Sequence, residues 1–179
     1  MNCTDQGVAL LNFLWNRPKY PDYIYHKWDD WDSSNPAMCS QLIKHIIEKM
    51  AAFNAPFLYC NFIRESYSLE PDQIIGLKKE IEDFISRHDY CEVKYASTSD
   101  IMAVMRLSQK QFEEEGCRLL SYFSELLISI PKEHMEWDDF LRIFHSGHQA
   151  HQMQKVRTMS EELILISTDE ALIQVYTNK

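Results

Sequence analysis

Apolar residues in this chain recur at helical spacing in some segments and form short strand-like runs in others, without a regular alternation between the two. Helical spacing predicts about five helices, one after Thr4 and others in the ranges 36–53, 71–88, 108–130 and 135–144. Strand-like runs lie in the ranges 57–64, 90–96, 101–107, 163–166 and 172–176. Because a doubly wound parallel sheet requires alternating strands and helices, this order predicts the α+β class.

Two short connections indicate how the strands pair. The residues 97–100 separate one pair of runs and the residues 167–170 separate the last pair, so each pair is expected to form a hairpin. The chain has 179 residues, 45% of them hydrophobic, which is enough to bury a core without cross-links. We therefore predict a single globular domain over residues 1–179, with about five helices packed on a small, mainly antiparallel sheet and a C-terminal β-hairpin.

Local signals mark several helix boundaries. Asn35 followed by Pro36 is a favourable helix start, because proline suits the first helical position. Ser108 and Gln111 have the spacing of a capping box, and Pro131 is expected to end the long helix that follows.

The charge balance excludes some classes of partner. Twenty-seven acidic and eighteen basic side chains give a formal net charge of -9. A negative field repels nucleic-acid phosphates and anionic lipid headgroups, and it attracts a basic protein. We expect a basic protein partner, with neither nucleic acid nor membrane.

An unusual segment, Tyr20–Asp32, combines five aromatic residues with four aspartates. The surrounding range 17–34 has two prolines and no clear period, which predicts a long ordered loop. Aromatic anchors beside carboxylates suit recognition of a basic partner, and no predicted helix starts at these aspartates. The candidate partner-binding residues are Tyr23, Tyr25, Trp28, Asp29, Asp30, Trp31 and Asp32. In the alternative interpretation, Trp28 and Trp31 cover the core while the aspartates face water.

Three histidines suggest a second kind of site. His145, His148 and His151 follow one another at intervals of three, so neighbouring imidazoles on a helix could share a metal ion. Asp138 or Asp139 would complete the ligand set. The spacing is not that of a known catalytic metal motif, and a solvated polar segment is the alternative.

Other chemistry has little support in the sequence. The four glycines are too far apart for a phosphate-binding loop, and no cofactor or catalytic residue is indicated. Five cysteines without a C-x-x-C pair indicate reduced thiols, and the first residues lack the cationic start of a secretory signal. No stretch approaches the ~20 apolar residues that cross a bilayer. A cytoplasmic location is expected.

These observations lead to one main expectation and two alternatives. The main expectation is a soluble, acidic, intracellular protein that binds and inhibits a basic protein, as an immunity protein or antitoxin would neutralise a nuclease-like toxin. The first alternative is a metal-dependent enzyme or metal-binding protein that uses the three histidines. The second is an adaptor or structural subunit. The sequence leaves the oligomeric state open.

Overall fold

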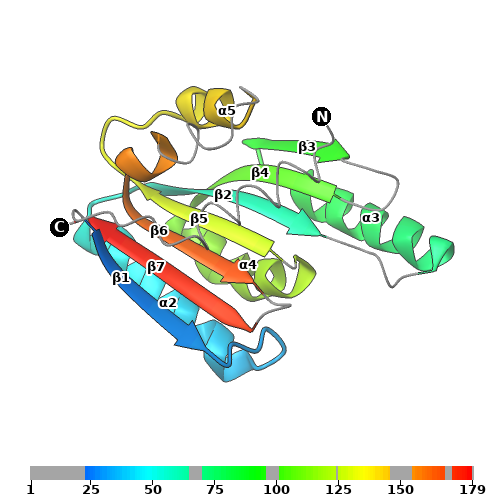
Figure 1. The fold of residues 1–179 in the computed structure, drawn as a ribbon. Helices are drawn as coiled ribbons and strands as arrows, with labels where there is room; N and C mark the ends of the chain where they lie inside the picture. Colours follow the sequence, from blue (N-terminus) through cyan, green and yellow to red (C-terminus); the bar gives the residue numbers. More distant parts are fainter. Residues whose placement is uncertain are drawn as a thin grey trace.

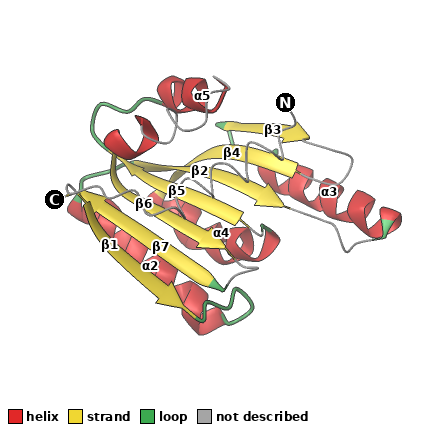
Figure 2. Cartoon of the chain, viewed as in Figure 1, coloured by secondary structure: helices red, strands yellow, loops and turns green. Residues whose placement is uncertain are grey.

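The computed structural model describes residues 23–64, 70–95, 101–123, 125–145, 155–167 and 171–178. The labelled helices in this part of the chain are α2 (Pro36–Ala52), α3 (Pro71–Ile85), α4 (Gln109–Tyr122) and α5 (Trp137–His145), and residues 155–158 form a further helical turn. The strands are β1 (Tyr23–Asp29), β2 (Phe57–Arg64), β3 (Cys91–Tyr95), β4 (Ile101–Ser108), β5 (Glu125–Pro131), β6 (Ser160–Ser167) and β7 (Leu172–Asn178). All pairings are antiparallel, in one seven-stranded sheet of order β1-β7-β6-β5-β2-β4-β3 (Figures 1 and 2).

The sheet carries helices on both faces. In Figure 1, α2, α3 and α4 lie behind the sheet, and α5 lies on its other side, next to one end of the strands. Alternate strand residues therefore enter two separate cores: on β2, Leu58 and Cys60 pack beneath α2, α3 and α4, whereas Tyr59 packs with α5. On β5, Ile128 and Leu127 divide in the same way. Burial on both faces explains why the central strands β2, β5 and β6 are largely apolar.

Several predictions are confirmed. The mixed α+β class is correct, and β3–β4 and β6–β7 form the two predicted hairpins. The side chain of Asn35 caps α2 by accepting from the backbone N–H groups of Ala37 and Met38. Ser108 and Gln111 form the predicted capping box of α4. The predicted helix after Thr4 lies outside the described residues.

The predicted long helix over residues 108–130 is wrong in its second half. The helix α4 ends at Tyr122, and β5 begins at Glu125 and occupies the middle of the sheet. Every residue from Leu126 to Pro131 is buried, because β5 pairs with β2 on one side and β6 on the other while both its faces are covered. A short apolar run of this kind fits a helical period and a two-sided strand equally well, and the strand pairing decides between them.

The predicted long loop over residues 17–34 is wrong over residues 23–29, whereas residues 30–34 do form a loop. Residues Tyr23–Asp29 form β1, which pairs with β7 from Tyr23 opposite Asn178 to Asp29 opposite Leu172. Aromatic and branched residues favour a strand once a partner supplies the hydrogen-bond ladder, even without clear alternation of apolar and polar positions.

Among the described helices, none is both long and apolar enough to cross a bilayer.

Candidate functional site

The turn between β1 and α2, residues 30–35, contains three of the predicted partner-binding residues. Asp30 follows β1 with a φ of 64°, a left-handed conformation that aspartate tolerates better than most residues. The next residue turns inward: Trp31 donates its backbone N–H to the carbonyl of Ala171 at 2.9 Å, and its side chain is only 6% exposed within the core. The turn therefore places Asp30 in solvent and Trp31 in the protein.

Asp32 has a structural role in this turn that the sequence did not suggest. Its Oδ1 accepts hydrogen bonds from the backbone N–H of Ser34 at 2.8 Å and from the Ser34 hydroxyl at 2.7 Å. These bonds lower the pKa of Asp32 below its ordinary value, so the exposed carboxylate is ionised at neutral pH. The N–H of Asn35 also donates to the carbonyl of Asp32, so this aspartate stabilises the turn that precedes α2.

The remaining residues of the predicted surface lie on β1. The backbones of Tyr23, Tyr25, Trp28 and Asp29 pair with β7, and their side chains lie outside the described part of the structure. For Trp31 the structure supports the alternative interpretation, a residue that covers the core. Asp30 and Asp32 are thus the exposed carboxylates of the turn, and hydrogen bonds from Ser34 hold that of Asp32.

The predicted metal site falls largely outside the described residues. His145 ends α5, whereas His148 and His151 lie in the range 146–154, which is not described. Asp139 is 3.3 Å from Arg142 in an ion pair within α5. Where side chains are described, no three His, Cys, Asp or Glu residues are grouped as metal ligands.

Three of the four described thiols, those of Cys39, Cys60 and Cys91, have a raised pKa. Cys60 is fully buried in β2, and burial raises the pKa of its thiol well above the ordinary value. Burial also raises the pKa of Cys39 and of Cys91. Since the thiolate is the reactive form, the raised pKa makes these three cysteines less reactive at neutral pH than an exposed thiol.

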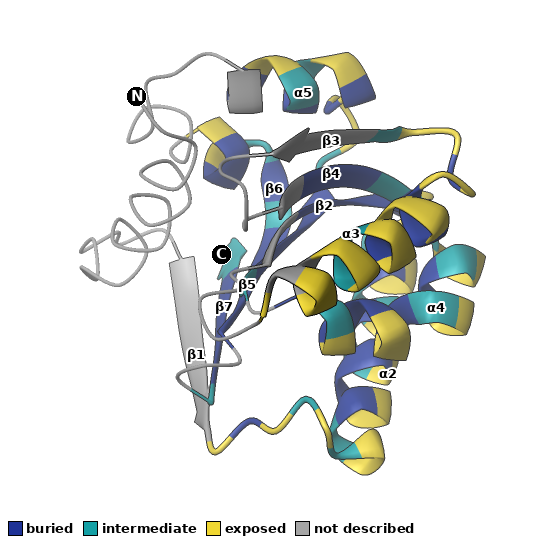
Figure 3. Ribbon diagram, turned by 90° about the vertical axis from the view of Figure 1, so that its right-hand side faces the viewer, coloured by how far each residue is buried: buried dark blue, intermediate teal, exposed yellow. Residues whose placement is uncertain are grey.

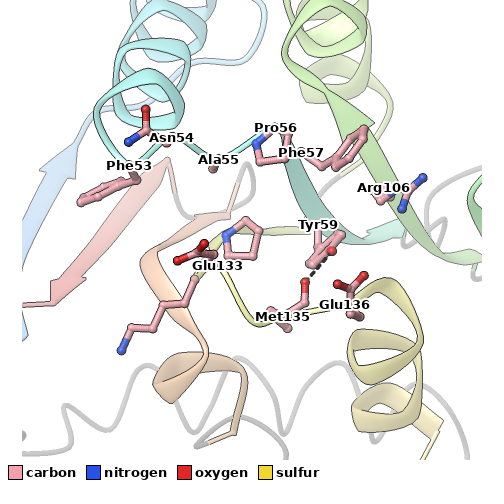
Figure 4. Close-up of a pocket in the computed structure, with 12 residues that line it drawn as sticks. Phe53, Asn54, Ala55, Pro56, Phe57, Tyr59, Arg106, Glu133, Met135 and Glu136 are labelled. Carbon is pink, nitrogen blue, oxygen red and sulfur yellow. Dashed lines mark hydrogen bonds between the residues drawn. The ribbon is translucent and has the colours of Figure 1, made fainter.

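A cavity of about 480 Å³, which the sequence did not indicate, lies between two connections of the fold (Figure 4). One wall is the α2–β2 connection, Phe53 to Phe57, and the other is the stretch from Pro131 to Glu136 between β5 and α5. Tyr59 lies between them and donates its hydroxyl to the carbonyl of Met135 at 2.8 Å. Burial raises the pKa of Tyr59 to about 12, so its phenol is not an acid or base near neutral pH.

The charges that line this cavity balance one another. Arg106 and Lys132 contribute two positive groups, and Glu133 and Glu136 contribute two negative groups. The guanidinium of Arg106 lies 4.3 Å from the centre of the Phe57 ring and 3.2 Å from that of Tyr90, so the two rings hold it in place. The helix α2 has 17 residues and is about 25 Å long, which separates this cavity from the β1–α2 turn at its other end. The cavity is therefore distinct from the acidic turn and has no acidic bias.

Proline and asparagine do mark the two connections that form the cavity. Pro56 and Pro131 show where helix or strand must stop, but they do not show that the two stretches meet. That contact depends on β2 pairing with β5, which is not predictable from the sequence because the apolar residues of β5 also fit a helical period.

Comparison with protein-family models, with curated proteins and with solved structures finds no match for this chain. The candidate site therefore rests on the sequence and the geometry of this chain alone.

Proposed function

We propose that this protein binds and inhibits a basic protein, and that the β1–α2 turn is part of its contact surface. The observation that carries this proposal is the presence of two exposed carboxylates, Asp30 and Asp32, on one short turn, where hydrogen bonds from Ser34 hold that of Asp32. Backbone strain at a non-glycine residue, here the φ of 64° at Asp30, often accompanies a functional position.

Rigid carboxylates favour binding for two physical reasons. A turn that is already ordered loses little conformational freedom when the partner binds. The net charge of -9 also attracts a basic protein over a distance, which raises the association rate at low salt. Both effects support a binding protein.

The specific form of the proposal is an immunity protein or antitoxin. A nuclease-like toxin presents a basic surface that binds the phosphates of its substrate. Carboxylates placed on an ordered turn would occupy the positions of these phosphates. We place this activity in the cytoplasm, where free thiols such as Cys39, Cys60 and Cys91 persist.

Affinity capture from the source organism tests the proposal. The wild-type protein, Asp30→Asn and the control Glu113→Gln serve as baits, and bound proteins are eluted from about 0.1 M to about 1 M salt, over which the Debye length falls from ~10 Å to ~3 Å. Asparagine keeps the tolerance for positive φ and removes only the charge of Asp30, whereas Glu113 is an exposed residue of α4. We expect a basic protein on the wild type and the control, and several-fold slower association with Asp30→Asn.

Two results would count against the proposal. Retained proteins that are not basic would refute the partner class, and equal association rates for Asp30→Asn and wild type would remove the turn from the contact surface. The inhibitory form is tested separately, by measuring whether an equimolar amount of this protein abolishes the nuclease activity of the captured partner.

A further inference from the structure

The helix α3 projects beyond the sheet (Figures 1 and 3). Its last turns are anchored in the core by Ile81, Phe84 and Ile85. In contrast, no described side chain from Glu70 to Glu80 is buried, and Ile75 is 66% exposed. The first half of α3 therefore offers an apolar side chain to solvent rather than to this chain.

Gly76 lies beside this exposed isoleucine. A Cβ atom at Gly76 would meet no described atom within 4 Å, so nothing in the described chain requires a glycine there. A glycine inside a helix is less stable than an alanine, because it loses more backbone freedom on folding. Close approach of another molecule to the helix backbone would explain why the position has no side chain.

Exposed carboxylates surround the same position. Asp72 and Glu80 lie one turn before and one turn after Gly76, and Asp83 follows on the same face of the helix. Within the described part of the chain, none of these carboxylates forms an ion pair. Glu82 is a fourth exposed carboxylate, and Lys79 is the exposed cation among them. The exposed face of α3 is therefore acidic around a small apolar centre.

We infer that this face of α3 docks a basic amphipathic segment of a partner protein. An apolar side chain of that segment packs over Gly76 and against Ile75, while its lysine or arginine groups pair with Asp72, Glu80 and Asp83. This inference rests on the proposed function and adds a second contact surface to it. The charge complementarity selects a basic segment as the occupant.

The first test uses a synthetic amphipathic helical peptide of lysine and leucine, titrated into the full chain while backbone amide NMR signals are recorded. We expect the largest shifts in α3, around Gly76. Shifts confined to the β1–α2 turn would overturn the α3 inference and leave the proposed function standing. Absence of any binding at low salt would count against the proposed function as well.

Two variants separate bulk from charge at the docking face. Gly76→Leu fills the space over the helix backbone without changing charge, and the open surroundings allow it to fold. Glu80→Gln combined with Asp83→Asn removes two charges. Glu113→Gln combined with Glu114→Gln removes two from the exposed face of α4, where Glu114 lies 3.8 Å from Lys110, and serves as the control. We expect each α3 variant to bind the peptide about tenfold more weakly than wild type.

Several outcomes would overturn the inference. If Gly76→Leu binds the peptide as tightly as wild type, the peptide does not approach the helix closely at Gly76. If the α3 and α4 charge variants lose equal affinity for the peptide, binding depends only on the net charge of the protein. Light scattering of the free protein tests whether a second copy of this chain occupies the face. If the wild type is a dimer and Gly76→Leu is a monomer, the face mediates self-association instead.

Discussion

The buried carboxylate of Glu162 on β6 gives a quantitative test of how the sheet holds α2. Its side chain is fully excluded from solvent, with one oxygen 3.2 Å from His45 Nε2 and the other 3.5 Å from Lys49 Nζ. The hydroxyl of Thr177 also donates to it at 2.8 Å. Burial raises the pKa of Glu162, but hydrogen bonds from His45 and Thr177 and the charge of Lys49 outweigh burial, so its pKa is lowered from 4.5.

The substitution Glu162→Gln keeps the size of the side chain and removes its charge. Breaking a fully buried ion pair destabilises a protein by about 3–5 kcal/mol. Here His45 and Lys49 keep 32% and 34% of their side chains exposed, so water compensates them in part. We therefore expect a loss of about 2 kcal/mol, which corresponds to a midpoint lower by about 4–8 °C in a domain of this size.

Thermal and urea unfolding at several pH values measure this loss, with Glu161→Gln as the control one residue away on β6. Because folding lowers the pKa of Glu162, its stabilising contribution is complete above 4.5 and disappears as the pH falls through the lower, folded-state pKa. The difference in the free energy of unfolding between wild type and Glu162→Gln should therefore become smaller as the pH is lowered. A loss below about 0.5 kcal/mol at pH ~7, or a gap that widens in acid, would refute the reasoning.

Three further substitutions test the fold by equilibrium unfolding. Gly76→Ala should stabilise the protein by about 0.5–1 kcal/mol, because its Cβ meets no neighbour and alanine favours the helix; a lower midpoint would contradict this. Asn35→Ala should destabilise it by about 1 kcal/mol through loss of the α2 cap, and Asn35→Ser should restore most of the loss if capping is the cause. Ile128→Ala should destabilise it by about 2–5 kcal/mol, because Ile128 is fully buried in the central strand β5; a change like that of an exposed residue would argue against that placement.

The candidate partner-binding turn was predictable only in part. The mixture of aromatic residues and aspartates marks the stretch of chain that contains this turn, and Asp30 and Asp32 are exposed there. The exposure of Asp30 and the burial of its neighbour Trp31 were not predictable from the sequence. They depend on the hydrogen bond from the Trp31 N–H to the carbonyl of Ala171, which is far away in the sequence. The docking face of α3 was also missed, since the helical period of the sequence shows an apolar stripe but not where the supporting sheet ends.

The sequence by itself determined the features that arise within a few residues of the chain. The caps at Asn35 and Ser108 and the hairpins β3–β4 and β6–β7 depend on short-range hydrogen bonds, so local residue types are sufficient to predict them. The negative charge is likewise a property of composition.

Only the tertiary structure decided the secondary structure of segments whose residues suit more than one conformation. Leu126 to Ile130 form a strand because β2 and β6 lie on either side, and Tyr23–Asp29 form β1 because β7 supplies its partner. In both cases the hydrogen bonds that select the strand come from distant parts of the chain, and their free energy outweighs the local preference. The same long-range pairing leaves α3 projecting from the sheet and places the acidic turn and the cavity at opposite ends of α2.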